Sequence, residues 1–143
     1  MSLNTLIVGC GDIGIPLGKQ LIAAGHQVWG LTRSSTLPPP LHSLHADVTK
    51  PETLAVLAGQ LFDYVVVTLT PGEFSDARYE QVFVQGLNNV LQRLEQPLAI
   101  ERLFFVSSSS VYHQSDGQWV DEYSPVEPSS FSGKRLLQAE QLL

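Results

Sequence analysis

Residues 3–14 read Leu-Asn-Thr-Leu-Ile-Val-Gly-Cys-Gly-Asp-Ile-Gly, an apolar run that ends in a glycine-rich turn. The run is short and contains β-branched residues, which is typical of a buried strand in a parallel sheet. Each glycine has its own role in such a turn. Gly9 lets the chain turn sharply out of the strand, Gly11 lets the backbone approach a ligand, and Gly14 lets the next helix pack on the sheet.

The residues after the turn complete a strand–helix–strand unit. Leu17, Leu21 and Ala24 recur at helical spacing, Gly25 stands where a helix ends, and residues 28–31 form a second apolar run. The first N–H groups of such a helix face the charge of a pyrophosphate, so the unit predicts a dinucleotide site. The alternative is a packing unit without a ligand. The turn residues predicted to bind the dinucleotide are Gly9, Gly11, Asp12, Ile13 and Gly14.

The end of the second strand indicates which dinucleotide is bound. NAD-selective sites place an acidic residue there, which accepts a hydrogen bond from the ribose 2′-hydroxyl. In this chain Thr32, Arg33, Ser34 and Ser35 occupy the position, without a carboxylate. A guanidinium can pair with a 2′-phosphate through two hydrogen bonds, and serine hydroxyls add donors. NADP is therefore favoured over NAD, bound by Arg33 and Ser34; the alternative is a solvated loop arginine.

The rest of the chain continues the alternation of strands and helices. This pattern predicts an α/β fold, a Rossmann-like doubly wound parallel sheet of about five strands with helices on both faces, in one domain over residues 1–143. Further strands are expected at residues 41–46, 64–69 and 102–107, and helices at residues 51–58, 76–94 and 133–143.

Ligands of such sheets bind beyond the carboxyl ends of the strands. Asp47 and Val48 follow the third expected strand, Thr70 follows the fourth, and Ser107 ends the fifth. All four are predicted to bind the cofactor. Asp47 could accept a hydrogen bond from the adenine amino group, or it could cap the turn that follows.

Composition restricts the function classes. The net charge of −6 and the absence of basic runs argue against nucleic acid or an anionic membrane as a partner. The single cysteine, Cys10, excludes an internal disulfide and favours a reducing, cytoplasmic location. It is expected to be a small residue that fits the glycine turn. The histidines lack the spacing of metal ligands, so no metal site is expected.

Three stretches together resemble the extended branch of the short-chain dehydrogenase/reductase superfamily, the NAD-dependent epimerase/dehydratase family. They are the unit from Gly9 to Arg33, the serine run from Phe105 to Tyr112, and residues 121–140, which contain Gly133-Lys134 and Ala139-Glu140. The resemblance covers essentially the whole chain. It implies an NAD(P)-binding oxidoreductase or isomerase that acts on a carbonyl or nucleotide-sugar-like small molecule.

The resemblance also assigns catalytic roles. It implies that Ser108 polarises the substrate carbonyl and that Lys134 lowers the pKa of a tyrosine four residues earlier and holds the nicotinamide ribose. That tyrosine is missing, because Ser130 lies four residues before Lys134 and Phe131 four before Arg135. The family's helix asparagine is replaced by Phe83. A non-catalytic module that binds NADP(H) or senses its redox state is therefore the alternative function.

The family places a substrate region after this catalytic helix, so the chain matches its N-terminal part only. A second alternative is consequently a truncated, inactive fragment of such an enzyme. The fifth strand, residues 102–107, would form an open sheet edge. We therefore expect homo-oligomers that associate through this strand or through the helix at residues 133–143.

Overall fold

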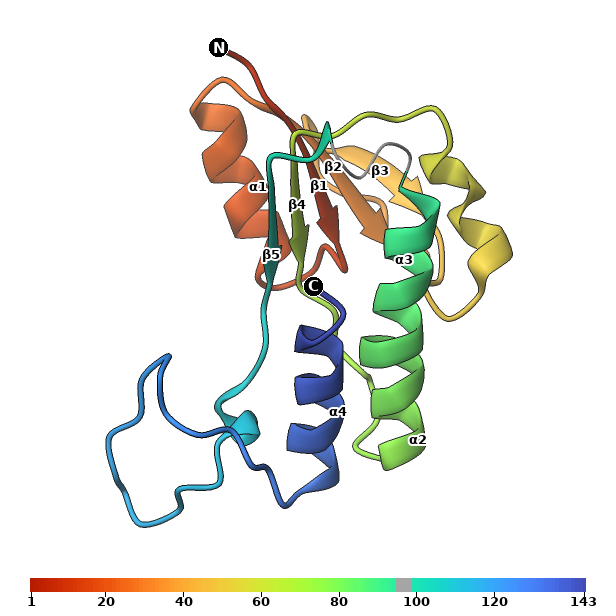
Figure 1. Cartoon of the computed structure of the whole chain (residues 1–143). Helices are drawn as coiled ribbons and strands as arrows, with labels where there is room; N and C mark the ends of the chain where they lie inside the picture. The colour runs from red at the N-terminus through yellow and green to blue at the C-terminus, as the bar shows by residue number, and fades with distance from the viewer. Residues whose placement is uncertain (95–98) are drawn as a thin grey trace.

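The computed structural model describes residues 1–94 and 99–143. Its strands form one parallel sheet in the order β3-β2-β1-β4-β5, which confirms the predicted Rossmann-like fold (Figure 1). Because β1 lies at the centre, with β2 and β4 as its neighbours, the strand order reverses next to the glycine turn. The strands are β1 (Asn4–Val8), β2 (Gln27–Thr32), β3 (His42–His45), β4 (Tyr64–Val67) and β5 (Arg102–Phe105).

Helices cover both faces of the sheet, as predicted. Helix α1 packs on one face, and α3 and the 3-10 helix η1 pack on the other, with α4 beside η2 and α2 (Figure 1). The helical segments are α1 (Gly14–Ala23), η1 (Pro51–Leu57), α2 (Asp76–Tyr79), the π-helix η2 (Glu80–Gly86), α3 (Leu87–Arg93), the 3-10 helix η4 (Ser109–Val111) and α4 (Phe131–Glu140).

The predicted helical segments differ from the observed ones either in form or in bounds. The single helix expected at residues 76–94 is a continuous run of α2, η2 and α3, in which the middle seven residues take the wider π form. The spacing of apolar residues did not reveal the π form, because an α-helix and a π-helix both bury side chains from successive turns along one face. Helix α4 begins at Phe131 rather than at residue 133, since the Ser130 hydroxyl accepts a hydrogen bond from the Gly133 N–H at 3.2 Å and caps it. Ala24, expected on the apolar face of α1, is its exposed C-cap.

The core lies mainly between the sheet and the helices η1 and α3. Val65 and Val67 of β4 face this side, together with the buried Leu87 and Val90 of α3. A smaller cluster, built around Ile7, lies under α1. Burial on both faces explains why β1 and β4 are continuous apolar runs rather than alternating ones.

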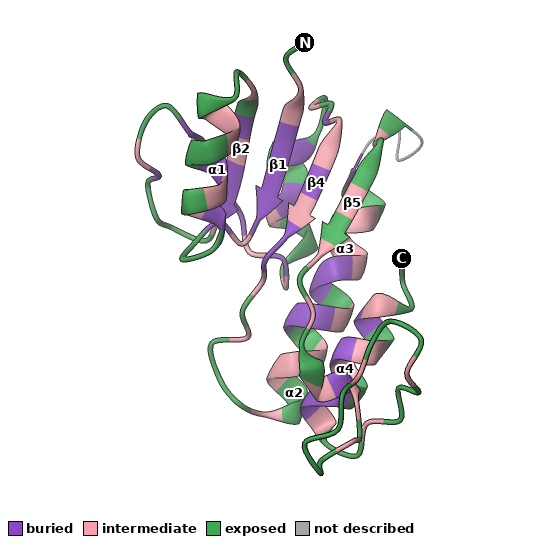
Figure 2. Cartoon of the chain, turned by 90° about the vertical axis from the view of Figure 1, so that its left-hand side faces the viewer, coloured by how far each residue is buried: buried purple, intermediate pink, exposed green. Residues whose placement is uncertain are grey.

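Strand β5 forms an edge of the sheet, as predicted. Leu103 and Phe105 pack against the larger core, whereas Phe104 on the opposite face keeps 49% of its surface exposed. Figure 2 shows the change from the buried central strand β1 to the largely exposed β5. Helix α1 packs against β1 and β2 and does not extend over the face of β5 on which Phe104 lies. An open apolar edge is suited to pairing with another surface.

Candidate functional site

A cavity of about 240 Å³ opens at the carboxyl ends of the strands. It is bordered by the turn after β1, by the residues that follow β2, β3 and β4, and by α2 and η2. This is the point at which the strand order reverses, where open α/β sheets bind ligands. The lining residues are Gly9, Cys10, Gly11, Leu31, Thr32, Arg33, Ser34, Ser35, Ala46, Asp47, Val48, Thr49, Leu69, Thr70, Arg78 and Val82.

The three glycines of the turn differ in what surrounds them. Gly9 has a φ of +80°, and a Cβ there would lie 3.0 Å from the Thr68 carbonyl oxygen, so only glycine fits. A Cβ on Gly14 would lie 2.8 Å from Ile7, which reflects the close approach of α1 to the sheet. Gly11 is different, because a Cβ there would meet no atom within 4 Å. The open space at Gly11 belongs to the cavity and suits a ligand that lies against the backbone.

Cys10 is part of the packing beneath the turn. Its side chain is buried and lies against the positions of Gly14 and Gly30. Burial raises the pKa of the Cys10 thiol, so the neutral thiol is favoured. This environment agrees with the expected role of a small residue that fits the turn.

Arg33 and Ser34 line the cavity from the loop after β2. The loop is folded on itself, since the Thr32 hydroxyl donates a hydrogen bond to the Ser35 carbonyl oxygen at 2.8 Å and His45 Nε2 lies 3.0 Å from the same oxygen. Arg33 itself is exposed, and within residues 1–94 and 99–143 it forms no ion pair. Its guanidinium is therefore available to an anion at the cavity mouth.

Asp47 caps the turn that follows it and also lines the cavity. Its Oδ1 accepts hydrogen bonds from the Thr49 N–H at 2.9 Å and the Thr49 hydroxyl at 2.7 Å. Desolvation raises the pKa of Asp47, but the bonds from Thr49 and the charges of Lys50 and Arg78 outweigh it and hold that pKa below the ordinary value. Asp47 is ionised at neutral pH and can accept from an amino group.

The other predicted cofactor residues separate into two groups. Val48 and Thr70 line the cavity, as do Gly9, Gly11 and Asp47. Asp12 and Ile13 are exposed beside the turn but outside the cavity lining. Ser107 also lies outside it; its hydroxyl is buried, and in the part of the chain that the structure describes it has no hydrogen-bond partner.

The two predicted catalytic residues do not lie in the cavity lining. Ser108 is exposed, and its hydroxyl accepts a hydrogen bond from the Ser110 N–H at 3.1 Å, which caps η4. Lys134 lines a separate surface hollow together with Asp76 and Gln138. The side chains of α4 that point into the protein are those of Ser132, Leu136 and Ala139. The phase of this helix therefore directs Lys134 away from the cavity.

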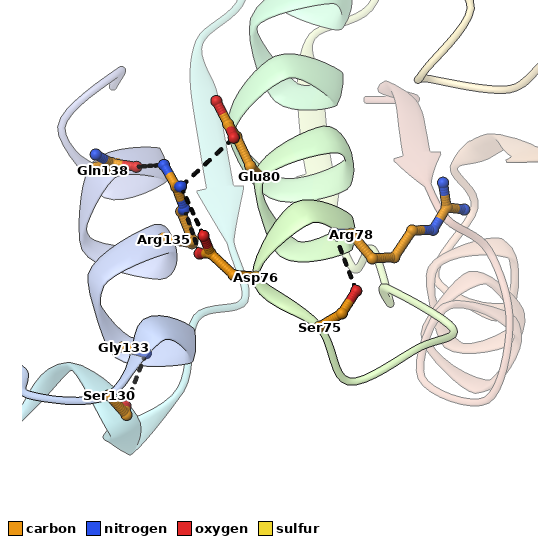
Figure 3. Close-up of polar contacts among 8 residues, drawn as sticks. All are labelled: Ser75, Asp76, Arg78, Glu80, Ser130, Gly133, Arg135 and Gln138. Atoms are coloured by element: carbon orange, nitrogen blue, oxygen red, sulfur yellow. Dashed lines mark hydrogen bonds and ion pairs between the residues drawn. The ribbon is translucent and has the colours of Figure 1, made fainter.

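Helix α4 is held in this orientation by polar and steric contacts with its neighbours. Arg135 forms a two-pronged pair with Asp76 of α2 at 2.7 and 3.0 Å and lies 3.4 Å from Glu80 (Figure 3). The hydrogen bonds from Arg135 lower the pKa of Asp76 despite some desolvation. A Cβ on Gly133 would collide with the Ser110 carbonyl oxygen, so α4 lies directly on the loop after β5.

Several residues of the cavity lining were not assigned to the site from the sequence, and most of these are close neighbours in the chain of residues that were assigned. Two come from a segment to which the sequence analysis gave no role in the site. Arg78 and Val82 reach the cavity from the helical run that follows β4. Figure 3 shows the Arg78 side chain extending from the side of α2 opposite to Asp76. The sequence carries no signal for this, because an arginine in a first helical turn is ordinarily a solvent-facing residue.

No helix within residues 1–94 and 99–143 has the length and apolar character needed to cross a membrane.

Comparison with known proteins agrees with this architecture. The family model described as "NAD dependent epimerase/dehydratase family" matches residues 5–141. A solved structure assigned as an NAD-dependent epimerase/dehydratase, from Methylobacillus flagellatus, is 40% identical with a TM-score of 0.84, over 98% of this chain and 50% of that one. The UDP-glucose 4-epimerase of Thermus thermophilus, solved with NAD, is 21% identical with a TM-score of 0.82, over 98% of this chain and 49% of that one. Among curated proteins no match was found.

The chain belongs to the NAD-dependent epimerase/dehydratase family. The predicted family and its Rossmann-like fold are thereby confirmed. The chain spans about half the length of the solved structures it matches.

Proposed function

We propose that this chain is a dinucleotide-binding unit that prefers NADP to NAD. The observation that supports the preference most directly is the position of Arg33, which lines the cavity beside Ser34 and Ser35. Such a group of donors suits a 2′-phosphate. The relatives solved with NAD support dinucleotide binding in general. They are at most 21% identical to this chain, so they say little about the loop that distinguishes the two cofactors.

Within this proposal, the cavity residues divide the cofactor among them. Gly9 and Gly11 hold the pyrophosphate against the backbone, Arg33 and Ser34 hold the 2′-phosphate, and Asp47 accepts from the adenine amino group. Val48 and Thr70 pack against the adenosine. Because Asp12, Ile13 and Ser107 lie outside the cavity lining, we assign them supporting contacts at its border.

Titration with NADPH and NADH, followed by nicotinamide fluorescence and thermal shift, tests the proposal. Tighter binding of NADPH is expected. Equal affinity for the two nucleotides would remove the argument from Arg33. No response to either nucleotide, or to their oxidised forms, at millimolar concentration would defeat the binding proposal altogether.

The reaction that we propose from the family is hydride transfer at a carbonyl or sugar carbon, with Ser108 as the polarising hydroxyl and Lys134 as the anchor of the ribose. A non-catalytic NADP(H)-binding module is the second candidate. Two observations favour it, because Ser130 and Phe131 stand where the tyrosine is expected and Lys134 lines a different hollow. A serine hydroxyl has a far higher pKa than a tyrosine and is a poor proton donor at neutral pH.

We further propose that copies of the chain associate with one another through β5 or α4. We also propose that the protein is located in the cytoplasm. The exposed face around Phe104 supports association, and the single buried Cys10 supports a reducing compartment. Light scattering over a range of protein concentrations tests the first point, and a monomer at high concentration would contradict it.

A further inference from the structure

Arg78 lines the cavity from α2, whereas Arg33 lines it from the loop after β2. Arg78 lies half-buried in the first turn of α2, which Ser75 caps, and its side chain points away from the Asp76–Arg135 pair (Figure 3). Its Nε donates a hydrogen bond to the Pro71 carbonyl oxygen at 2.8 Å, and its Nη1 lies 3.4 Å from Gln81 Oε1. The guanidinium is thus fixed beside the end of β4 rather than free in solvent.

The contacts of Arg78 leave it without an ion pair among the described residues, in which Arg135 forms ion pairs. A guanidinium has five N–H groups, and the two bonds to Pro71 and Gln81 use only part of them. Its positive charge also contributes, as the smallest of the causes, to the lowered pKa of Asp47, which lines the same cavity. A fixed, half-buried cation with unused donors is suited to an anionic ligand.

The strand order indicates which phosphate group of a bound dinucleotide Arg78 faces. Arg33 follows β2 and Arg78 is tied to the residue after Thr70, at the end of β4, so the two arginines flank the glycine turn that follows the central strand β1. The turn offers backbone N–H groups but no cation of its own. A pyrophosphate that lies on this turn carries two negative charges, and Arg78 is the cavity cation on the side away from the 2′-phosphate site.

We infer that Arg78 binds the pyrophosphate of the dinucleotide, an inference that rests on the proposed function of the cavity. Because NAD and NADP share the pyrophosphate, Arg78 contributes to the affinity for both, whereas Arg33 distinguishes between them. Arg78 is then a general cofactor-binding residue, and Arg33 a specificity-determining one.

The test is titration of the wild-type chain, Arg78→Gln, Arg78→Lys and the control Arg93→Gln with NADH and NADPH at several salt concentrations. Arg93 is exposed and lies outside the cavity lining. Arg78→Gln should raise both dissociation constants by about tenfold, because a charge-assisted contact is lost. Arg78→Lys should recover part of the affinity because it keeps the charge. The dependence of affinity on salt should be weaker in Arg78→Gln than in the wild type.

Each of the other results would overturn either the proposed function of the cavity or the role of Arg78 in it. If the wild type binds neither nucleotide, the proposed function fails and the inference fails with it. If the wild type binds and Arg78→Gln binds equally well, the inference alone is overturned. A loss confined to NADPH would assign Arg78 to the 2′-phosphate instead. Equal losses of nucleotide affinity in Arg78→Gln and Arg78→Lys, with an unchanged salt dependence, would overturn the inference. They would show that Arg78 acts only through its hydrogen bond to Pro71, which positions the loop after β4.

Discussion

The glycine-turn region and the α4 region were both predicted to supply the site, yet they differ in what the fold does with them. Gly9, Gly11 and Arg33 meet in one cavity. The α4 region consists of α4 and the loop that precedes it, residues 106–140. There Ser108 caps the short helix η4, and Lys134 lines a different hollow. The first site depends on backbone geometry that glycine spacing encodes directly. The second depends on the rotational phase of a helix, which is set by its cap and by its packing against η2 and the loop after β5.

The largest effect is expected at the glycine turn itself. Gly9→Ala should destabilise the fold by roughly 2–4 kcal/mol, because it combines a positive φ with backbone contacts near 3.0 Å. Chemical denaturation measures this loss. Gly11→Ala is the matched control, since its Cβ meets nothing within 4 Å. It should leave stability nearly unchanged and weaken nucleotide binding by about tenfold or more, because the methyl group occupies the ligand's space. Equal stability losses in the two variants would contradict the distinct roles of the two glycines.

The next largest effect is expected at Arg33. Arg33→Gln should weaken NADPH binding by about ten- to a hundredfold, because a charge-assisted pair contributes roughly 1.5–3 kcal/mol, and should leave NADH binding within about twofold. Fluorescence titration of both nucleotides measures the ratio. A parallel loss for the two nucleotides would show that Arg33 does not read the 2′-phosphate.

A smaller effect is expected in the α4 region. Lys134→Gln should change NADPH affinity by less than about twofold, since its side chain lies outside the cavity and a solvated charge acts weakly at a distance. The role that the family implies, anchoring the nicotinamide ribose, requires a clear loss instead. The same titration therefore separates the two, with Arg33→Gln as the positive control. A large loss of NADPH affinity in Lys134→Gln would show that α4 contributes to the cofactor site.

The smallest effect concerns the pair that orients α4. Asp76 has a folded-state pKa below its ordinary value, so its contribution to stability is present above the unfolded-state pKa and is lost as the pH falls through the folded one. Asp76→Asn should lower the melting temperature slightly at pH 7, with a difference that vanishes in acid. Thermal melts at several pH values measure this, with the exposed Asp116→Asn as the control. A difference independent of pH would mean that the charge of Asp76 is not the cause.

Most of the fold could be predicted from the sequence, because the signals are local. Apolar runs such as residues 4–8 identified the strands, and the Gly9–Gly14 turn identified the class of ligand. The π-helical form within residues 76–94 and the bounds of α4 could not be predicted as well. A π-helical segment and a capping serine depend on contacts between elements, which one-dimensional periodicity does not contain.

The amino-acid sequence is enough to predict the parallel sheet, the glycine turn at its centre and the family to which the chain belongs. Those features follow from residue spacing and from the conformations that glycine alone adopts. Only the tertiary structure decided which side chains meet at the cavity: it brought Arg78 in from α2 and directed Lys134 out. The physical reason is that the direction of a helical side chain depends on how the helix packs, and the packing of α2 and α4 is fixed by residues far away in the chain.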